Sequence, residues 1–346
     1  MILMISFLII PTLVINILIA YNLDKIAFFI NIFDEPDNRL KKHKFRVPLL
    51  GGIILVINFI SFIIFHFFNN YDYLNTNIPI RNIFTILVFL FLFFFLGIVD
   101  DKHKLKPENK FFTSIFISLF LLLLNKDLLI VNINLSFYDN SIFLGNFSYF
   151  FTIFCIIILI NAINFYDGIN GQSIIFFIIL FCYLSFKSPF FIFYLFITLI
   201  LLFILYLNLL NKIFMGDNGI YFLAAFLSAS LIYEYNKHDT FESADEIFLL
   251  LLLPGYDLLR LSFTRLLAGK NPFYGDRNHI HHKLIKKFSL IKTNLILILL
   301  SVTPIFLFSF IDVNFLVILF LFTLVYILII FKLPKNDKKR YFRKAK

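Results

Sequence analysis

Residues 82–101 read NIFTILVFLFLFFFLGIVDD, an apolar run that ends in two adjacent carboxylates. A helix rises about 1.5 Å per residue, so about 20 such residues cross the roughly 30 Å hydrocarbon core of a bilayer. The two acidic residues, Asp100 and Asp101, follow the apolar run at once. The stretch therefore predicts a membrane-spanning helix with paired carboxylates at one end.

Runs of this kind recur along the whole chain of 346 residues, of which 60% are hydrophobic and 15% charged. A soluble protein would carry roughly a quarter charged residues. We therefore predict one all-α, polytopic integral membrane domain over residues 1–346, not a soluble enzyme with an anchor. We expect about eleven transmembrane helices, at 2–21, 47–68, 82–99, 111–125, 148–165, 173–186, 189–207, 217–233, 247–264, 294–310 and 314–332.

The positive charge is concentrated on one side of this predicted topology. Alternate connections, together with the helix ends beside them, hold 27 of the 31 Lys and Arg residues. The positive-inside rule makes that side cytoplasmic, with the N-terminus outside and the C-terminus inside. The cytoplasmic connections are then 22–46, 100–110, 166–172, 208–216, 265–293 and the basic tail 333–346.

The same distribution explains the net charge of +10 as a topology signal, so we expect no nucleic-acid partner. The partner is the bilayer, and the tail is expected on anionic headgroups. Segment 126–147 is too polar to span and is expected to form an external hairpin. The prediction is a multi-pass protein of a bacterial inner (cytoplasmic) membrane.

Polar motifs gather on the predicted cytoplasmic face, and the first is Asp100-Asp101. One interpretation is a solvated helix end beside Lys102 and Lys104. Adjacent carboxylates repel, however, and a helix C-terminus disfavours negative charge. That double penalty favours a functional role, so Asp100 and Asp101 are candidate catalytic residues.

The second motif is Met215-Gly216-Asp217, which opens the predicted helix 217–233. Asp217 stands where an aspartate could simply cap a helix N-terminus. The functional alternative is a Mg²⁺ ligand, because Mg²⁺ takes one or two carboxylates and completes its shell with water and phosphate oxygens.

The third motif closes the predicted helix 148–165 and reads NAINFYDGING over residues 161–171. Asn161, Asn164 and Asp167 recur at a spacing of three and share a helix face. They could form hydrogen bonds between helices. They could equally bind a nucleotide base or hold metal-bound water.

The fourth motif is His279-x-His281-His282 in the basic loop 265–293. Zinc is not favoured, because neither an i,i+4 histidine pair nor a cysteine accompanies it. With Arg265 and Arg277 nearby in sequence, the histidines are more typical of a polyanion site, since a diphosphate needs several donors. A fifth motif, Gly51-Gly52, permits close backbone approach at the head of the second helix.

With these motifs in this order, the chain resembles the polyprenyl-phosphate N-acetylhexosamine-1-phosphate transferase superfamily (glycosyltransferase family 4). The likeness spans roughly residues 34–290. It implies membrane enzymes that move a sugar 1-phosphate from a UDP-sugar to a polyprenyl phosphate such as undecaprenyl phosphate, with Mg²⁺ or Mn²⁺, and release UMP. A homodimer is common in the family.

The resemblance also implies roles for individual residues. Asp100 and Asp101 match the paired aspartates that activate or position the lipid phosphate, and Asp217 matches the metal-binding aspartate. Asn164 and Asp167 match the element at the nucleotide and metal site, and the histidine motif is associated with the substrate diphosphate. The candidate substrate-binding set is Asn164, Asp167, Asn170, Arg265, Arg277, His279, His281 and His282, with Asp217 and Asp167 as metal ligands.

Two branches of the family compete. The spacing Pro272-Phe273-x-x-Asp276-Arg277-x-His279-x-His281-His282 resembles the branch that starts O-antigen, common antigen or teichoic-acid linkage units with GlcNAc 1-phosphate. The alternative, the phospho-N-acetylmuramoyl-pentapeptide transferase of peptidoglycan synthesis, has three consecutive histidines, whereas Ile280 interrupts the run here. Two departures remain: Asn170 replaces a frequent Asp, and Ile220 replaces a Ser.

An anion transporter is the rival from another class, because carboxylates within a membrane also mark transport paths. A transporter should place its polar groups near mid-membrane and show repeat symmetry. Here the carboxylates cluster at helix ends and the sequence shows no repeat, so we favour the enzyme, with Asp100 as the candidate acceptor of the lipid phosphate proton.

Overall fold

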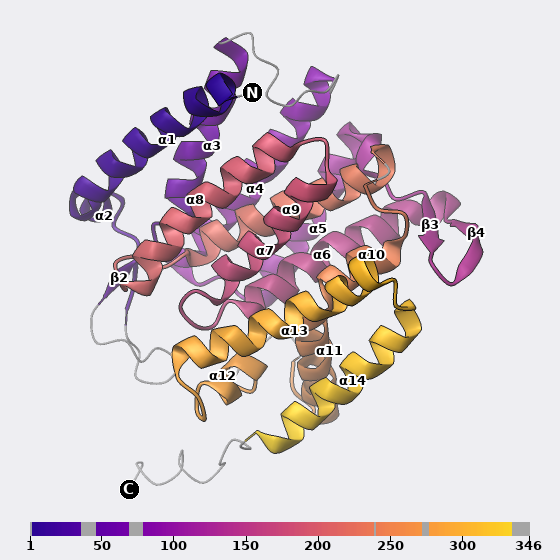
Figure 1. Ribbon diagram of the computed structural model, residues 1–346. Helices are drawn as coiled ribbons and strands as arrows, with labels where there is room; N and C mark the ends of the chain where they lie inside the picture. Colours follow the sequence, from indigo (N-terminus) through magenta and orange to yellow (C-terminus); the bar gives the residue numbers. More distant parts are fainter. Residues whose placement is uncertain (1, 36–45, 69–78, 239, 272–276, 334–346) are drawn as a thin grey trace, which may run out of the picture.

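The computed structural model describes residues 2–35, 46–68, 79–238, 240–271 and 277–333. Three sequence predictions fall outside these ranges: the charged loop 36–45, residues 272–276 before the histidine motif, and tail residues 334–346. The described chain is predominantly helical (Figure 1). Its helices are α1 (Ile2–Tyr21), α2 (Leu23–Ile30), α3 (Gly51–Phe68), α4 (Ile80–His103), α5 (Pro107–Leu124), α6 (Ser148–Tyr166), α7 (Gln172–Lys187), α8 (Phe191–Leu209), α9 (Gly216–Lys237), α10 (Ala244–Leu250), α11 (Leu252–Leu267), α12 (Ile280–Leu284), α13 (Leu290–Ile311) and α14 (Phe315–Lys332).

Each of the eleven predicted ranges contains a helix. Within the described residues, six helices are long and apolar enough to cross a membrane, or up to eight if each of two bent helix pairs is one span. The prediction of a polytopic helical membrane protein is therefore confirmed. The count of eleven spans and the orientation of the termini stay predictions.

Several helices differ from their predicted ranges, and three of these differences change the arrangement of the chain. α4 continues beyond residue 99 to His103, which places Asp100 and Asp101 inside its last turn. α3 begins only at Gly51, because Val47–Pro48 (β2) pairs with Phe33–Asp34 (β1) in an antiparallel ladder. The predicted helix 247–264 is broken into α10 and α11, which are bent by 73°. Pro254 explains the break, because proline has no N–H for the carbonyl four residues earlier and its ring clashes with that carbonyl.

The expected hairpin in 126–147 is confirmed. Asn132–Leu135 (β3) pairs antiparallel with Tyr138–Phe143 (β4), and short 3-10 turns, Lys126–Leu128 (η1) and Gly145–Phe147 (η2), flank the pair. The backbone N–H of Asn134 donates to the hydroxyl of Tyr235 at 2.8 Å, which ties the hairpin to α9. The predicted loop 22–46 differs, since it contains α2, which turns away from α1 by 72°.

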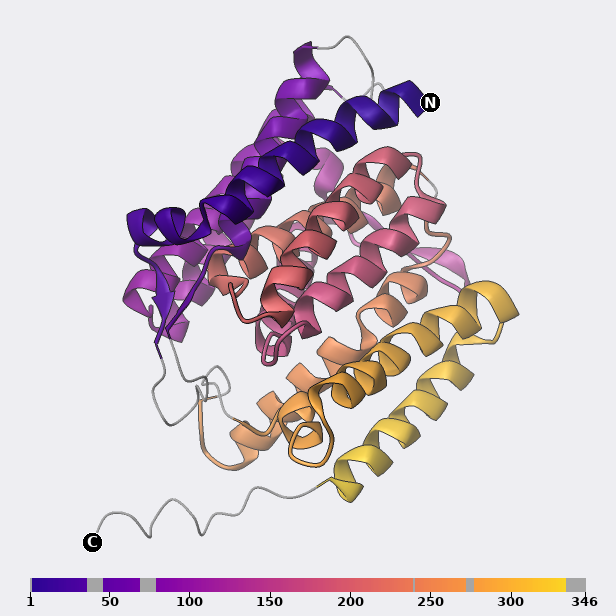
Figure 2. The ribbon, with the colours of Figure 1, turned by 60° about the vertical axis from the view of Figure 1, so that its left-hand side comes forward.

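α9 forms the centre of the molecule. Most of its side chains are buried, and it packs against α3, α4 and α6. α13 and α14, orange to yellow, form one edge of the molecule, while α1 and α3, indigo to purple, form the opposite edge (Figures 1 and 2). Because the first turn of α9 meets the last turn of α4, the two acidic motifs are brought together at one end of the bundle.

Candidate active site

Asp101 of α4 caps the N-terminus of α9. Its carboxylate accepts the backbone N–H of Asp217 at 2.9 Å and that of Asn218 at 3.0 Å, and it also accepts the side-chain amide of Asn218. The first N–H groups of a helix have no partner within it and attract negative charge. The first residue of α9, Gly216, has a φ of +75°, which glycine adopts without strain. Asp101 therefore holds Asp217 in position from a different helix.

Asp217 is left free of the capping role. The N-cap residue of α9 is Met215, and Asp217 lies in the first turn with its side chain 34% exposed. The structural alternative considered for the sequence, in which Asp217 itself caps the helix, is wrong because Asp101 supplies that cap. An accessible carboxylate without a capping role is available for a ligand.

Asp100 is buried beside Asp217 and is paired with a lysine. Its carboxylate forms an ion pair with Lys110 near the start of α5 and accepts the backbone N–H of Leu105 at 3.0 Å. The Lys110 ammonium also lies 3.9 Å from a carboxylate oxygen of Asp217. Lys110 thus bridges two of the three carboxylates and offsets the repulsion expected between them.

The connection between α6 and α7 joins these carboxylates to the rest of the site. Asn164 donates weakly to the hydroxyl of Tyr221 at 3.4 Å, and that hydroxyl faces Asp100. Asp167 is exposed and accepts a hydrogen bond from Ser173 in the first turn of α7. The motif residues Asn164 and Asp167 therefore lie at the same end of the bundle as the carboxylate cluster.

Asn161 and Asn170 have local or structural partners. The Asn161 amide donates to the carbonyl of Ile157 in its own helix at 2.8 Å. The Asn170 amide donates to the side-chain oxygen of Asn211 at 2.6 Å, beyond the end of α8. The amide predicted to contact substrate at Asn170 thus holds the connection between α6 and α7 against α8.

The histidine motif packs onto the same connection. His281 is buried with its Nδ1 3.1 Å from the Gln172 amide nitrogen, and its Nε2 lies against Gly168. A Cβ at Gly168 would be only 1.8 Å from that Nε2, so this position has no room for a side chain. His279 stacks on His281 with ring centroids 5.3 Å apart.

His281 and His282 are uncharged near neutral pH in the free protein. Burial, together with the neighbouring rings of His282 and His279, lowers the pKa of His281 well below its usual value. Burial, His279 and Arg277 lower the pKa of His282 to about 4. Both rings are therefore neutral until an anion approaches, and they can donate N–H groups without adding charge.

The predicted arginines flank this cluster. Arg265 of α11 is buried with its guanidinium 5.5 Å from the ring centroid of Phe165, and the same ring lies 5.8 Å from His279. Arg277 is half-buried two residues before the histidine motif and contributes positive charge at His282. The histidine motif, Arg265 and residues 164–168 thus form one wall of the site.

Sequence reasoning missed three residues of this region: Lys110, Tyr221 and Asp257. Lys110 was counted only as topology charge, and Tyr221 lies within an apolar helix with no distinguishing pattern. Asp257 is buried in α11 and bonded to His279. A carboxylate within a predicted span is unusual, and that signal could have found Asp257.

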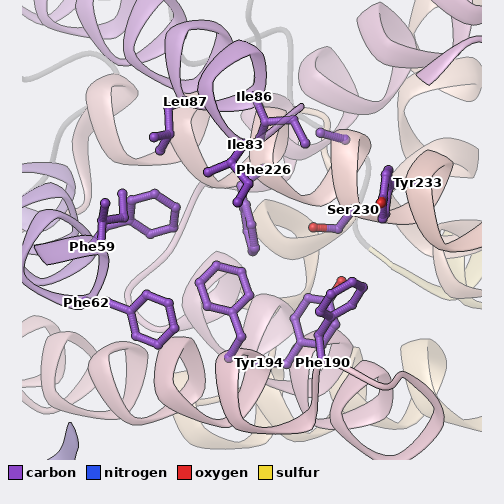
Figure 3. A pocket seen from close by; sticks show the side chains of 13 residues that line it. Phe59, Phe62, Ile83, Ile86, Leu87, Phe190, Tyr194, Phe226, Ser230 and Tyr233 are labelled. Atoms are coloured by element: carbon purple, nitrogen blue, oxygen red, sulfur yellow. The ribbon is translucent and has the colours of Figure 1, made fainter. Parts of the chain in front are cut away.

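One apolar cavity of the described residues lies elsewhere. Figure 3 shows the rings of Phe59, Phe62, Tyr194 and Phe226 around it. It also touches Ile83, near the start of α4, whereas Asp100 lies near the end of that helix. At about 1.5 Å per residue the two ends are about 25 Å apart, so the cavity is separate from the carboxylates.

The chain matches known proteins over most of its length. The model of the family described as Glycosyl transferase family 4 matches residues 83–234. The undecaprenyl-phosphate alpha-N-acetylglucosaminyl 1-phosphate transferase of Salmonella typhi is 27% identical over 274 residues, covering 76% of this chain and 71% of that protein. Its Escherichia coli (strain K12) counterpart is 26% identical over 274 residues, with the same shares. A probable undecaprenyl-phosphate N-acetylglucosaminyl 1-phosphate transferase of Bacillus subtilis (strain 168) is 27% identical over 269 residues, 75% of this chain and 72% of the relative. These matches confirm the resemblance that the motifs predicted.

Proposed function

From the match to glycosyl transferase family 4 and to these relatives, we propose that the protein transfers a sugar 1-phosphate to undecaprenyl phosphate. The donor in this proposal is a UDP-sugar, UDP-GlcNAc or a related N-acetylhexosamine, and UMP is released. The product would start a lipid-linked glycan of the O-antigen, common antigen or teichoic-acid linkage type. The observation that carries the proposal is the meeting of Asp100, Asp101 and Asp217 with Lys110 in a membrane-protein bundle.

The relatives also favour one branch of the family. Their names give N-acetylglucosaminyl 1-phosphate transfer, and none of those described above is a phospho-N-acetylmuramoyl-pentapeptide transferase. The interruption of the histidine run at Ile280 supports the same choice. The peptidoglycan reaction is the second candidate and is distinguished by its donor.

Phosphoryl transfer requires mainly positioning and charge stabilisation. In our proposal an oxygen of the lipid phosphate attacks the sugar-linked phosphorus of the UDP-sugar. The bond between this phosphorus and the oxygen that it shares with the UMP part breaks, and UMP leaves. Lys110, already 3.9 Å from Asp217, is placed to meet phosphate charge. Asp100 would orient the lipid phosphate or accept its proton, and Asp101 keeps Asp217 in place through the start of α9.

Divalent metal is proposed at Asp217, with Asp167 as a second carboxylate. Within the described residues no group of three or more His, Cys, Asp or Glu side chains is arranged to hold a metal by itself. The accessible carboxylate of Asp217, which has no capping role, suits Mg²⁺, because Mg²⁺ binds through one or two carboxylates and takes phosphate oxygens and water for the rest. When bound, Mg²⁺ or Mn²⁺ would neutralise the donor diphosphate.

The wall formed by the histidine motif and Arg265, in which His281 and His282 are neutral, is proposed to receive the diphosphate. Neutral imidazole N–H groups and a guanidinium are both donors to phosphate oxygens. We place the protein in the inner membrane as a multi-pass protein, and by the positive-inside rule this end of the bundle then faces the cytoplasm. The cytoplasm is where a UDP-sugar is available.

The test is UMP release by purified protein in detergent with undecaprenyl phosphate and a panel of UDP-sugars, with and without EDTA. Release that depends on lipid and metal, and is fastest with UDP-GlcNAc or a relative, supports the proposal. UDP-MurNAc-pentapeptide as the best donor would assign the protein to the peptidoglycan branch. Folded protein that releases no UMP with any donor would contradict the function.

A further inference from the structure

The buried carboxylate of Asp257 contacts the histidine motif from α11. One of its oxygens lies 2.8 Å from Nδ1 of His279, and the backbone N–H of Ile280 donates to the other at 3.2 Å. Asp257 is 2% exposed and His279 is 4% exposed, so the pair is shielded from water. None of the sequence motifs described above contains Asp257.

Asp257 has further donors on two helices. Arg260, one turn along α11, donates to it at 2.6 Å, and the Tyr326 hydroxyl of α14 donates at 2.9 Å. Arg260 also donates to the Tyr326 oxygen at 2.9 Å and to the backbone carbonyl of Asn278 at 2.9 Å. A carboxylate that accepts from so many N–H and O–H groups is ionised, because its protonated form would have to donate one of these bonds.

An ionised Asp257 determines the tautomer of His279. A carboxylate can only accept, so Nδ1 of His279 must carry the proton in their shared hydrogen bond. The second ring nitrogen, Nε2, is then the one left for a ligand, and it donates to a phosphate oxygen only when the ring carries both protons. The positive charge of that form is stabilised by Asp257. Carboxylates orient ligand-binding histidines in this way in metal sites and catalytic triads.

We propose that Asp257 is a positioning residue that acts through His279 to orient its imidazole toward the donor diphosphate, with Tyr326 and Arg260 holding the carboxylate in place. This inference rests on the proposed function for the identity of the ligand. It also gives the C-terminal helix α14 a part in the site, although α14 lies outside the matched residues 83–234.

The test is a double-mutant cycle between Asp257→Asn and His279→Gln, read as steady-state kinetics with a UDP-sugar and undecaprenyl phosphate. We expect Asp257→Asn to lower kcat/KM for the UDP-sugar by about 10- to 100-fold, the range seen when such orienting partners are removed. The KM for undecaprenyl phosphate should not change. In the His279→Gln background, Asp257→Asn should cause no further loss, because residues that act as a unit are not additive.

Two tyrosine variants distinguish a role of Tyr326 in positioning Asp257 from a role only in attaching α14 to α11. Tyr326→Phe removes one donor to Asp257 and should lower kcat/KM for the UDP-sugar by a smaller factor than Asp257→Asn does. The matched control is Tyr256→Phe, because the Tyr256 hydroxyl also joins α11 to α14, through Thr323 at 2.6 Å, without a hydrogen bond to Asp257. Tyr256→Phe should leave both KM values unchanged.

Two results would overturn the inference. The first is a double variant whose loss of kcat/KM equals the product of the losses in Asp257→Asn and His279→Gln, which would mean that the two residues act independently. The second is a lower unfolding temperature of Asp257→Asn with unchanged KM values, which would mean a structural role only. The ¹⁵N chemical shifts of His279 report which ring nitrogen carries the proton, and they do so in protein that is not catalysing a reaction. A proton on Nδ1 that is lost or shared in Asp257→Asn supports the pairing even if no donor releases UMP, whereas an unchanged tautomer contradicts it.

Discussion

The carboxylate of Asp101 accepts the backbone N–H of Asp217, yet the carboxylates of the two residues have different surroundings. Asp101 accepts the first N–H groups of α9, whereas Asp217 accepts no capping bond. We expect Asp101→Ala to lower the free energy of unfolding by about 1–2 kcal/mol, the usual effect of losing a helix cap, and to lower UMP release as well. Asp217→Asn should abolish UMP release with little change in unfolding temperature. Thermal unfolding and turnover of the two purified variants decide this, and an equal loss of stability in both would contradict the division of roles.

Gly168 offers a second contrast at the level of one residue. A Cβ there would be 1.8 Å from Nε2 of His281, so Gly168→Ala must displace a buried ring of the histidine motif. We expect kcat/KM for the UDP-sugar to fall by at least about tenfold, since a displacement of 1 Å at a reacting group can cost about 100-fold. Gly255→Ala is the control, because nothing lies within 4 Å of a Cβ at Gly255. Equal activity of both variants would show that His281 can move without consequence.

The lowered pKa of His282 makes stability depend on pH. Its folded pKa of about 4 lies below the usual value of 6.5, so between these values the unfolded chain binds a proton that the folded protein does not. Stability should therefore decrease as pH falls from about 6.5 toward about 4. We expect the drop in unfolding temperature between pH 7 and pH 5 to be smaller in His282→Gln than in wild type. The same drop in both proteins would mean that His282 does not titrate in this way.

α4 and α9 meet without room for side chains at their closest point. A Cβ at Gly97 would lie 2.4 Å from Cα of Asn218 and 2.6 Å from the carbonyl oxygen of Asp217, both backbone atoms that cannot rotate away. Gly97→Ala should therefore separate the helices and break the cap from Asp101. We expect a destabilisation of at least about 1–3 kcal/mol, as for other overpacked interiors, with loss of UMP release. Unfolding temperature measures the first effect, and unchanged stability would show that the two helices can move apart freely.

The long helices follow from local sequence, whereas the cap that Asp101 provides at the N-terminus of α9 does not. Apolar runs predicted the long helices, because a bilayer requires each spanning segment to satisfy its own backbone hydrogen bonds. They did not predict the short helices α2 and α12, which lie in predicted loops. The acidic and histidine motifs also predicted where the candidate site would lie. The break before Pro254, the cap from Asp101 and the pairing of Asp257 with His279 were missed. These depend on tertiary contacts, and Asp101 and Asp217 are 116 residues apart in sequence. Hydropathy and spacing carry no information about such partners.

At the scale of the whole molecule, the charge distribution predicts which end of the bundle faces the cytoplasm. The hairpin residue Asn140 and the residue Lys102 beside the paired aspartates are both exposed and belong to opposite predicted sides. In a background without Cys155 and Cys182, Asn140→Cys should react with a membrane-impermeant thiol reagent in intact cells. Lys102→Cys should react only after the membrane is opened. The reverse pattern would invert the topology and move the carboxylates to the outer face.

The cap at the start of α9 has a consequence for how the protein is made. α4 precedes α9 in the chain and is therefore synthesised first, so Asp100 and Asp101 at first lack the N–H groups of α9 that later bind Asp101. The site is completed only when two segments that leave the ribosome far apart in time dock together, a non-local step of the kind that slows folding. An interrupted chain that stops before α9 would therefore carry Asp100 and Asp101 and yet have no assembled site.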